Sequence, residues 1–96
     1  PQTHTIGGSR ARGRGVVRRG SLVDVGFEGA ELRDVMRLLS EVAGVDVIVE
    51  EDVRGTVTVD LRDVRPLDAM QAIAEAHGAS LEISGRTAIV RARAGR

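Results

Sequence analysis

An internal repeat of constant spacing runs through the central part of this 96-residue chain. Val25 corresponds to Val59 and Gly44 corresponds to Gly78, since each pair is 34 positions apart. The other pairs matched at this repeat spacing are Phe27 and Leu61, Asp34 and Asp68, Met36 and Met70, Leu39 and Ile73, Glu41 and Glu75, Val47 and Leu81, and Val49 and Ile83. Tetratricopeptide repeats have the same spacing, but each consists of two helices. The hydrophobic pattern therefore decides which unit is repeated here.

The first unit has the pattern of a strand, a helix and a second strand. Apolar residues alternate over residues 21–27, which is typical of a half-buried strand. From Ala30 to Ala43 they recur at helical spacing, and Gly44 is a typical residue for the end of a helix. Residues 45–49 are rich in β-branched side chains and predict the second strand.

The second unit repeats this pattern. A polar turn over residues 50–55 precedes an alternating strand over residues 56–61. Pro66 suits the first position of a second helix, which Gly78 is expected to end. Each unit thus has strand periodicity on both sides of one helix, and this excludes the helical-hairpin repeat.

A hairpin completes the second unit. Residues 81–84 and 87–90 predict two strands joined by a two-residue type II′ turn, because Gly85 stands at its first central position. Such a loop places Ile83 opposite Ala88 and Leu81 opposite Val90. The sequence therefore predicts an α+β domain built from a duplicated β-α-β unit, with two helices and about five strands.

Charge is distributed unevenly along the chain, although the formal net charge is zero. Residues 1–20 contain five arginines and no acid, a charge of +5. Residues 21–90 contain six arginines and all 14 acids, a net charge of −8, and residues 91–96 contain three arginines. We therefore expect a basic flexible linker over residues 1–20, one folded domain over residues 21–90, and a basic tail or the start of a next linker over residues 91–96.

The arginines and glycines of residues 1–20 leave nucleic-acid binding open as an alternative function. Segments of this composition bind phosphate groups electrostatically. The neighbouring domain is acidic and would repel phosphate, so we expect nucleic-acid binding to be the less favoured function.

The composition excludes several kinds of chemical site. The chain has no cysteine, tryptophan or tyrosine, and Phe27 is its one aromatic residue. Disulfides, thiolate zinc sites and multi-ring base-stacking platforms are therefore excluded. Neither histidine is a convincing ligand or catalytic residue. His4 lies in the arginine-rich segment, and His77 is expected to be a capping or partly buried residue at the end of a helix. The acidic residues 50–52 lack the alternating ligand spacing of a calcium loop. No serine has a histidine partner in a recognisable arrangement. We expect no catalytic, cofactor-binding or metal-binding residue and no small-molecule substrate.

Without a catalytic constellation, the sequence favours a protein-interaction function. The open sheets of an α+β domain have edge strands, and a partner strand can extend them. The candidate edge strands are residues 22–27 and 56–61. The candidate partner-binding residues on these strands are Asp24, Thr56, Thr58 and Asp60.

Three runs of the sequence resemble a known family, the secretin and TonB N-terminus short domain. The family pattern has a strand that ends in Phe, a helix with Ala-x-Leu, a Gly, a Val/Ile strand, a Val-x-Gly-x-Val-Thr strand and a second helix with Ala-Leu. The corresponding residues here are Phe27, Ala30, Leu32, Gly44, residues 45–49, residues 53–58, and Ala69 with Met70. The resemblance covers residues 21–90 and is nearest to the secretins of type IV pili.

The resemblance implies two helices between a two-stranded and a three-stranded sheet. It also implies a periplasmic location, as part of an outer-membrane protein of a Gram-negative bacterium, and no enzyme activity or cofactor. In secretin channels of type IV pili or type II secretion, such a domain assembles in the ring with neighbouring subunits. It also contacts inner-membrane components, such as a lipoprotein or platform protein. The alternative is the signalling domain of a TonB-dependent receptor, which contacts an anti-sigma regulator. We expect the isolated domain to be a monomer.

Overall fold

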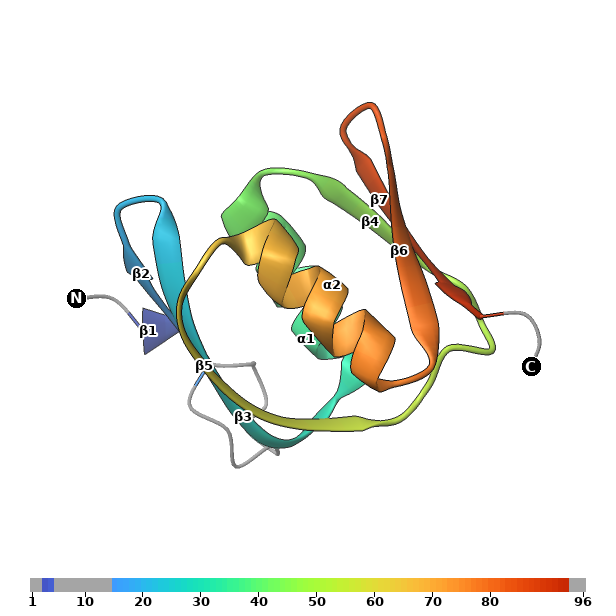
Figure 1. Ribbon diagram of the computed structural model, residues 1–96, viewed down its shortest axis with the longest axis horizontal. Coiled ribbons are helices and arrows are strands. Elements are labelled where there is room, and N and C mark those ends of the chain that lie inside the picture. The colour runs from blue at the N-terminus through green and yellow to red at the C-terminus, as the bar shows by residue number, and fades with distance from the viewer. Residues whose placement is uncertain (1–2, 5–14, 94–96) are drawn as a thin grey trace.

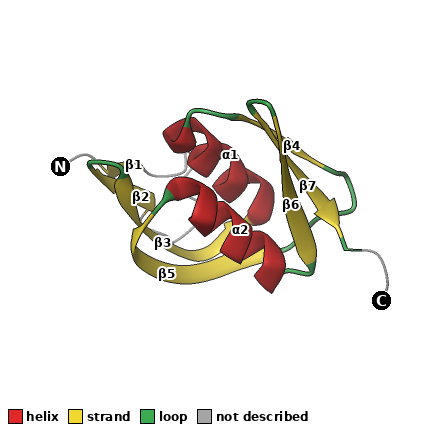
Figure 2. Cartoon of the chain, turned by 45° about the horizontal axis from the view of Figure 1, so that its top comes forward, coloured by secondary structure: helices red, strands yellow, loops and turns green. Residues whose placement is uncertain are grey.

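The computed structural model describes residues 3–4 and 15–93, which form two helices packed between two β-sheets (Figures 1 and 2). The elements in chain order are β1 (Thr3–His4), β2 (Gly15–Arg19), β3 (Leu22–Glu31), α1 (Leu32–Ala43), β4 (Asp46–Val49), β5 (Thr56–Val64), α2 (Pro66–Ala76), β6 (Ala79–Ser84) and β7 (Thr87–Ala92). The larger sheet has the strand order β1-β2-β3-β5 and is antiparallel throughout. The smaller sheet has the order β4-β7-β6, in which β4 runs parallel to β7. The predicted α+β class is confirmed.

The core consists of apolar side chains from both sheets and both helices. The largest side chains in it that lose all or nearly all solvent contact are Leu32, Met36, Leu39, Met70, Val16, Val23, Val25, Val35, Val57 and Val90. Each helix supplies an apolar stripe at helical spacing, and the inward residues of β3 and β5 face those stripes. The helices are therefore held between the sheets by burial of apolar surface.

The duplication is confirmed, and it gives the fold an internal two-fold relation. At the repeat spacing, β3, α1 and β4 are equivalent to β5, α2 and β6. β3 and β5 lie side by side, and Gly26 pairs with its own equivalent, Asp60. The pairs on either side are reciprocal: Val25–Leu61 with Phe27–Val59, and Val23–Val64 with Ala30–Val57. The local two-fold axis therefore passes through the Gly26–Asp60 pair.

The predicted ends of the helices and the hairpin are close to those observed. Gly44 caps α1 in the left-handed conformation at φ 78°, where a side chain would be strained. α2 begins at Pro66 as predicted, and it ends at Ala76, two positions before Gly78. The β6–β7 hairpin has the predicted pairs, Leu81 with Val90 and Ile83 with Ala88.

The predicted boundary of the folded domain at residue 21 is wrong. β2 lies within the segment predicted as linker, and it pairs with β3 from Gly15 to Arg19. Val16 of this strand is fully buried. The larger sheet consequently has four strands where the resemblance implied two. The apolar run in this segment is only Val16 and Val17, too short to register as a strand beside arginines and glycines. At the other end, β7 extends to Ala92, into the predicted tail.

Two strands are longer than their alternation predicted, because each contains a β-bulge. β3 continues to Glu31 and β5 continues to Val64. The register between the two strands shifts twice along β3, between Val23 and Val25 and between Phe27 and Ala30. A bulge inserts one residue and shifts the inward–outward phase of the strand. Ala30, predicted as the start of the helix, is therefore still a buried strand residue.

Candidate functional site

The outer edge of β5 is an open strand edge next to a helix. β3 covers one side of β5, and no other strand among residues 3–4 and 15–93 pairs with its second side. Thr56, Thr58 and Asp60 are all exposed on this strand, as the sequence predicted. The prediction that residues 56–61 form an edge strand is confirmed.

The main chain of three residues of β5 faces this open edge. The carbonyl oxygen of Thr56 lies 2.8 Å from His77 Nε2 at the end of α2, so it points away from β3. Backbone polar groups in a strand alternate between the two edges with a period of two residues. The N–H and C=O groups of Thr58 and Asp60 therefore face the same open edge. These groups are suited to pair with the main chain of another strand.

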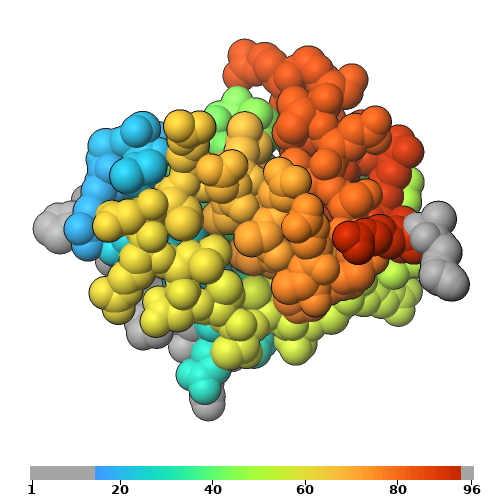
Figure 3. Space-filling view, viewed as in Figure 1, coloured from blue at the N-terminus to red at the C-terminus, as the bar shows by residue number. Residues whose placement is uncertain are grey.

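An apolar groove of about 250 Å³ lies between this edge and α2. Its lining residues are Val57, Thr58, Val59, Leu61, Ala72, Ile73, Ala76 and His77. Figure 3 shows β5 and α2 adjoining on the face turned toward the viewer. Ala72 and Ala76 are one helical turn apart and exposed, and their short side chains leave the groove open. The geometry offers apolar burial and free main-chain groups side by side.

His77 joins the end of α2 to the beginning of β5. Its Nδ1 lies 2.9 Å from the carbonyl oxygen of Ile73, and its Nε2 lies 2.8 Å from that of Thr56. A carbonyl oxygen only accepts hydrogen bonds, so both contacts are hydrogen bonds when both ring nitrogens carry protons. A cationic ring at the C-terminus of a helix also interacts favourably with the helix dipole. The predicted capping role of this histidine is confirmed, since His77 is the C-cap residue of α2.

Two of the predicted partner-binding side chains hold the bulges of the sheet. Thr58 Oγ1 accepts a hydrogen bond from the N–H of Gly29 at 3.1 Å. Asp24 Oδ1 accepts one from the N–H of Asp63 at 3.0 Å. Asp24 is the two-fold equivalent of Thr58, and Gly29 is the equivalent of Asp63, so these are one contact made twice. Both bulge residues have positive φ, 68° at Gly29 and 54° at Asp63.

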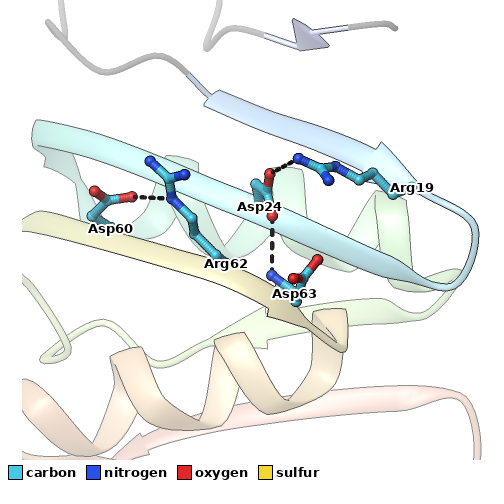
Figure 4. Close-up of polar contacts among 5 residues, drawn as sticks. All are labelled: Arg19, Asp24, Asp60, Arg62 and Asp63. Atoms are coloured by element: carbon cyan, nitrogen blue, oxygen red, sulfur yellow. Dashed lines mark hydrogen bonds and ion pairs between the residues drawn. The ribbon is translucent and has the colours of Figure 1, made fainter.

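Asp24 lies at the centre of a small polar network on the outer face of the larger sheet (Figure 4). Its Oδ2 accepts a hydrogen bond from Arg19 Nη2 at 2.7 Å. The bond from the Asp63 N–H lowers the pKa of Asp24 below its usual value of 3.8, and the charge of Arg19 acts in the same direction. Asp60 forms a looser ion pair with Arg62, at 3.8 Å. The two contacts of Asp24 link β3 to β2 and to β5.

The placement of Asp24 on an edge strand is wrong. β3 lies between β2 and β5, so its main chain is paired on both sides. The prediction failed because it left β2 out of the sheet. Thr56, Thr58 and Asp60 do lie together on the open edge. The sequence reasoning missed the α2 side of the groove, Ala72 and Ala76. Their small size within an otherwise polar helix face was the available indication.

Polar and charged side chains also gather elsewhere on the described part of the chain. Within the described part of the chain, no three His, Cys, Asp or Glu side chains gather as a metal site would require. No helix there is long and apolar enough to cross a membrane. A larger polar hollow of about 580 Å³ has Glu31 and Glu51 beside Arg33 and Arg54, so charges of both signs line it.

Comparisons with known proteins do not assign a family. No protein-family model matches this chain, and no curated protein matches it. The resemblance to the secretin and TonB N-terminus short domain therefore stays a prediction from the sequence pattern.

Proposed function

We propose that this chain is a non-catalytic protein-interaction domain of an outer-membrane secretin, of a type IV pilus or type II secretion system. In this proposal the domain lies in the periplasm, assembles in the channel's ring with neighbouring subunits, and contacts an inner-membrane lipoprotein or platform protein. The observation that carries the interaction role is the open edge of β5 beside an apolar groove. Strand addition to such an edge is a common mode of protein recognition.

The charge of the folded region supports a protein partner over a nucleic acid. Residues 15–93 contain 14 acids and ten arginines, a net charge of −4. Asp60, Asp63, Asp68 and Glu75 lie on β5 and α2, the two elements that border the groove. A phosphate backbone would be repelled at this surface, whereas a basic polypeptide would be attracted.

Site-specific crosslinking of the full-length protein in its bacterial host tests the proposed function. A photoreactive residue at Thr58 should capture a neighbouring secretin subunit or an inner-membrane lipoprotein or platform protein, identified by mass spectrometry. Externally added protease should reach the domain only after the outer membrane is permeabilised. Capture of an anti-sigma regulator would instead assign the signalling domain of a TonB-dependent receptor. A cytoplasmic location of the domain would contradict both assignments.

A further inference from the structure

We infer that the open edge of β5 binds an extended, basic segment of a partner protein as an antiparallel strand, in the position that β2 takes on β3. This inference rests on the proposed interaction function and specifies its ligand. The two-fold relation between the halves supplies the geometry, because the molecule contains one occupied copy and one open copy of the same edge.

The occupied copy is the β2–β3 edge. β2 runs antiparallel to β3, with Gly15 opposite Gly26 and Val16 opposite Val25. Val16 points into the core and is fully buried. Applying the repeat spacing to β3 gives the equivalent pairs on β5. A bound strand would place its buried residue opposite Val59 and the preceding residue opposite Asp60.

The groove provides the space that this buried residue needs. Ala72 and Ala76 of α2 are equivalent to Leu38 and Val42 of α1. Leu38 and Val42 pack against the core in the first half, where the strand edge is already covered. The shorter side chains in the second half leave the groove of about 250 Å³ next to Val59. A β-branched aliphatic side chain, such as the valine at the equivalent place in β2, fits this apolar surface.

The hydrogen-bonding groups of the open edge match those used on the occupied edge. At the repeat spacing, Thr56, Thr58 and Asp60 of β5 are equivalent to three residues of β3. These residues are Leu22, Asp24 and Gly26, and their main-chain N–H and C=O groups face β2. Thr58 and Asp60 can each donate through N–H and accept through C=O to an antiparallel strand. His77 Nε2 lies 2.8 Å from the carbonyl oxygen of Thr56 and covers it, so the accessible part of the edge begins at Thr58.

The charge of the two elements that line the groove favours a basic segment. β5 and α2 contribute Asp60, Asp63, Asp68 and Glu75, against Arg62 and the N-cap residue of α2, Arg65. These two elements, with the N-cap residue, thus carry two more negative than positive groups. β2 itself combines valines with Arg18 and Arg19, so it has the expected character of the ligand. We therefore expect valine or isoleucine flanked by arginine or lysine in the bound segment.

A peptide titration of the full 96-residue chain tests this inference. The probe is a capped synthetic peptide with the sequence of residues 14–20, Arg-Gly-Val-Val-Arg-Arg-Gly, added to isotope-labelled protein and followed by NMR. The amide signals of Thr58, Asp60, Ala72 and Ala76 should shift in a saturable manner. Shifts confined to β3, or no saturable shift, would overturn the inference. A dimer of the chain that forms through β5 and dissociates when the peptide is added would also overturn the inference. In that case the natural occupant of the open edge would be a second copy of the chain.

Two variants separate groove and edge, and the chain offers the matched controls. Ala72→Leu with Ala76→Val copies the first half and fills the groove, and it should weaken peptide binding about tenfold. Asp60→Pro removes an N–H that faces the open edge and should weaken binding to a similar extent, whereas Asp60→Asn keeps that N–H and should weaken it less. Unchanged affinity in both the filled-groove variant and Asp60→Pro, with native circular dichroism, would contradict the inference.

The peptide titration and the crosslinking experiment can fail independently of each other. Peptide binding at β5 without capture of secretin-system proteins in cells would keep the strand-binding edge and reject the secretin assignment. Capture of those proteins from Thr58, with no peptide binding to the chain, would keep the function and reject the proposed ligand.

Discussion

The two halves of the duplication differ most at the outer edges of β3 and β5. In the first half, β2 covers β3, and Leu38 and Val42 of α1 pack against the core. In the second half, no described strand covers β5, and Ala72 and Ala76 stand at the equivalent helix positions. Two smaller side chains and one unpaired strand edge thus distinguish a buried surface from an accessible one. The bulges, by contrast, are held by the same kind of contact in both halves.

The largest effect is expected in the core that the halves share. Leu39→Ala and Ile73→Ala truncate equivalent buried side chains of α1 and α2. Each should lower the free energy of unfolding by about 3 kcal/mol, because a cavity adds to the lost transfer energy. Urea unfolding followed by circular dichroism measures both. If one variant lost less than about 1 kcal/mol, the halves would not contribute equally to the core.

The next effect tests whether β2 belongs to the fold. Val16→Ala removes buried methyl groups and should lower the free energy of unfolding by about 1.5 kcal/mol. Val17→Ala, on the opposite face of the same strand, is the control and should cost less, since Val17 is half-buried. Equally small effects at both positions would show that residues 15–19 do not stabilise the fold and form a linker instead.

The residue types at the two bulges can be exchanged between the halves of the duplication. Asp63 is the one non-glycine residue with positive φ in the described ranges, and its equivalent is Gly29. Asp63→Gly should raise the free energy of unfolding by about 0.5 kcal/mol, and Gly29→Asp should lower it by about 1 kcal/mol. Nothing lies within 4 Å of a Cβ placed on Gly29, so its cost is conformational. Thermal unfolding of both variants tests the pair, and a destabilised Asp63→Gly would show that the Asp63 side chain makes a needed contact.

The smallest effect is a pH dependence present in only one half. The pKa of Asp24 is lowered in the folded state, chiefly by the hydrogen bond from the Asp63 N–H. Its charged form therefore stabilises the fold above the unfolded value of 3.8, and this contribution is lost as pH falls through the lower, folded pKa. Asp24→Asn keeps an acceptor and removes the charge, so its melting temperature should fall less in acid than that of the natural chain.

Thr58 is the matched control for this titration. Thr58→Val removes the equivalent hydrogen bond to Gly29 but no titratable group. It should lower the melting temperature by the same amount at neutral and acidic pH. Melting curves of the three proteins across the acid range measure the contrast, and parallel curves for all three would disprove the role of the Asp24 charge.

Much of the fold could be predicted from the order of hydrophobic periods. The internal repeat and its periodicity located both helices, the strand pairs of the hairpin and the α+β class. The strand extensions could not be predicted, because a bulge shifts the inward phase and makes Phe27 and Ala30 face the same side. β2 was missed because Val16 and Val17 form too short a pattern between glycines and arginines.

The candidate site, too, could be predicted from the sequence only in part. Alternation along residues 56–61 predicted a strand with Thr56, Thr58 and Asp60 on its polar side, and this strand was one of two candidate edges. The sequence alone thus determined the duplicated unit, the inward residues of each element and the lack of thiol and multi-ring chemistry, because these depend on local period and composition. Only the tertiary structure decided which edge stays open and that Ala72 and Ala76 lie beside it. Strand order and the space between elements arise from contacts between residues far apart in the chain.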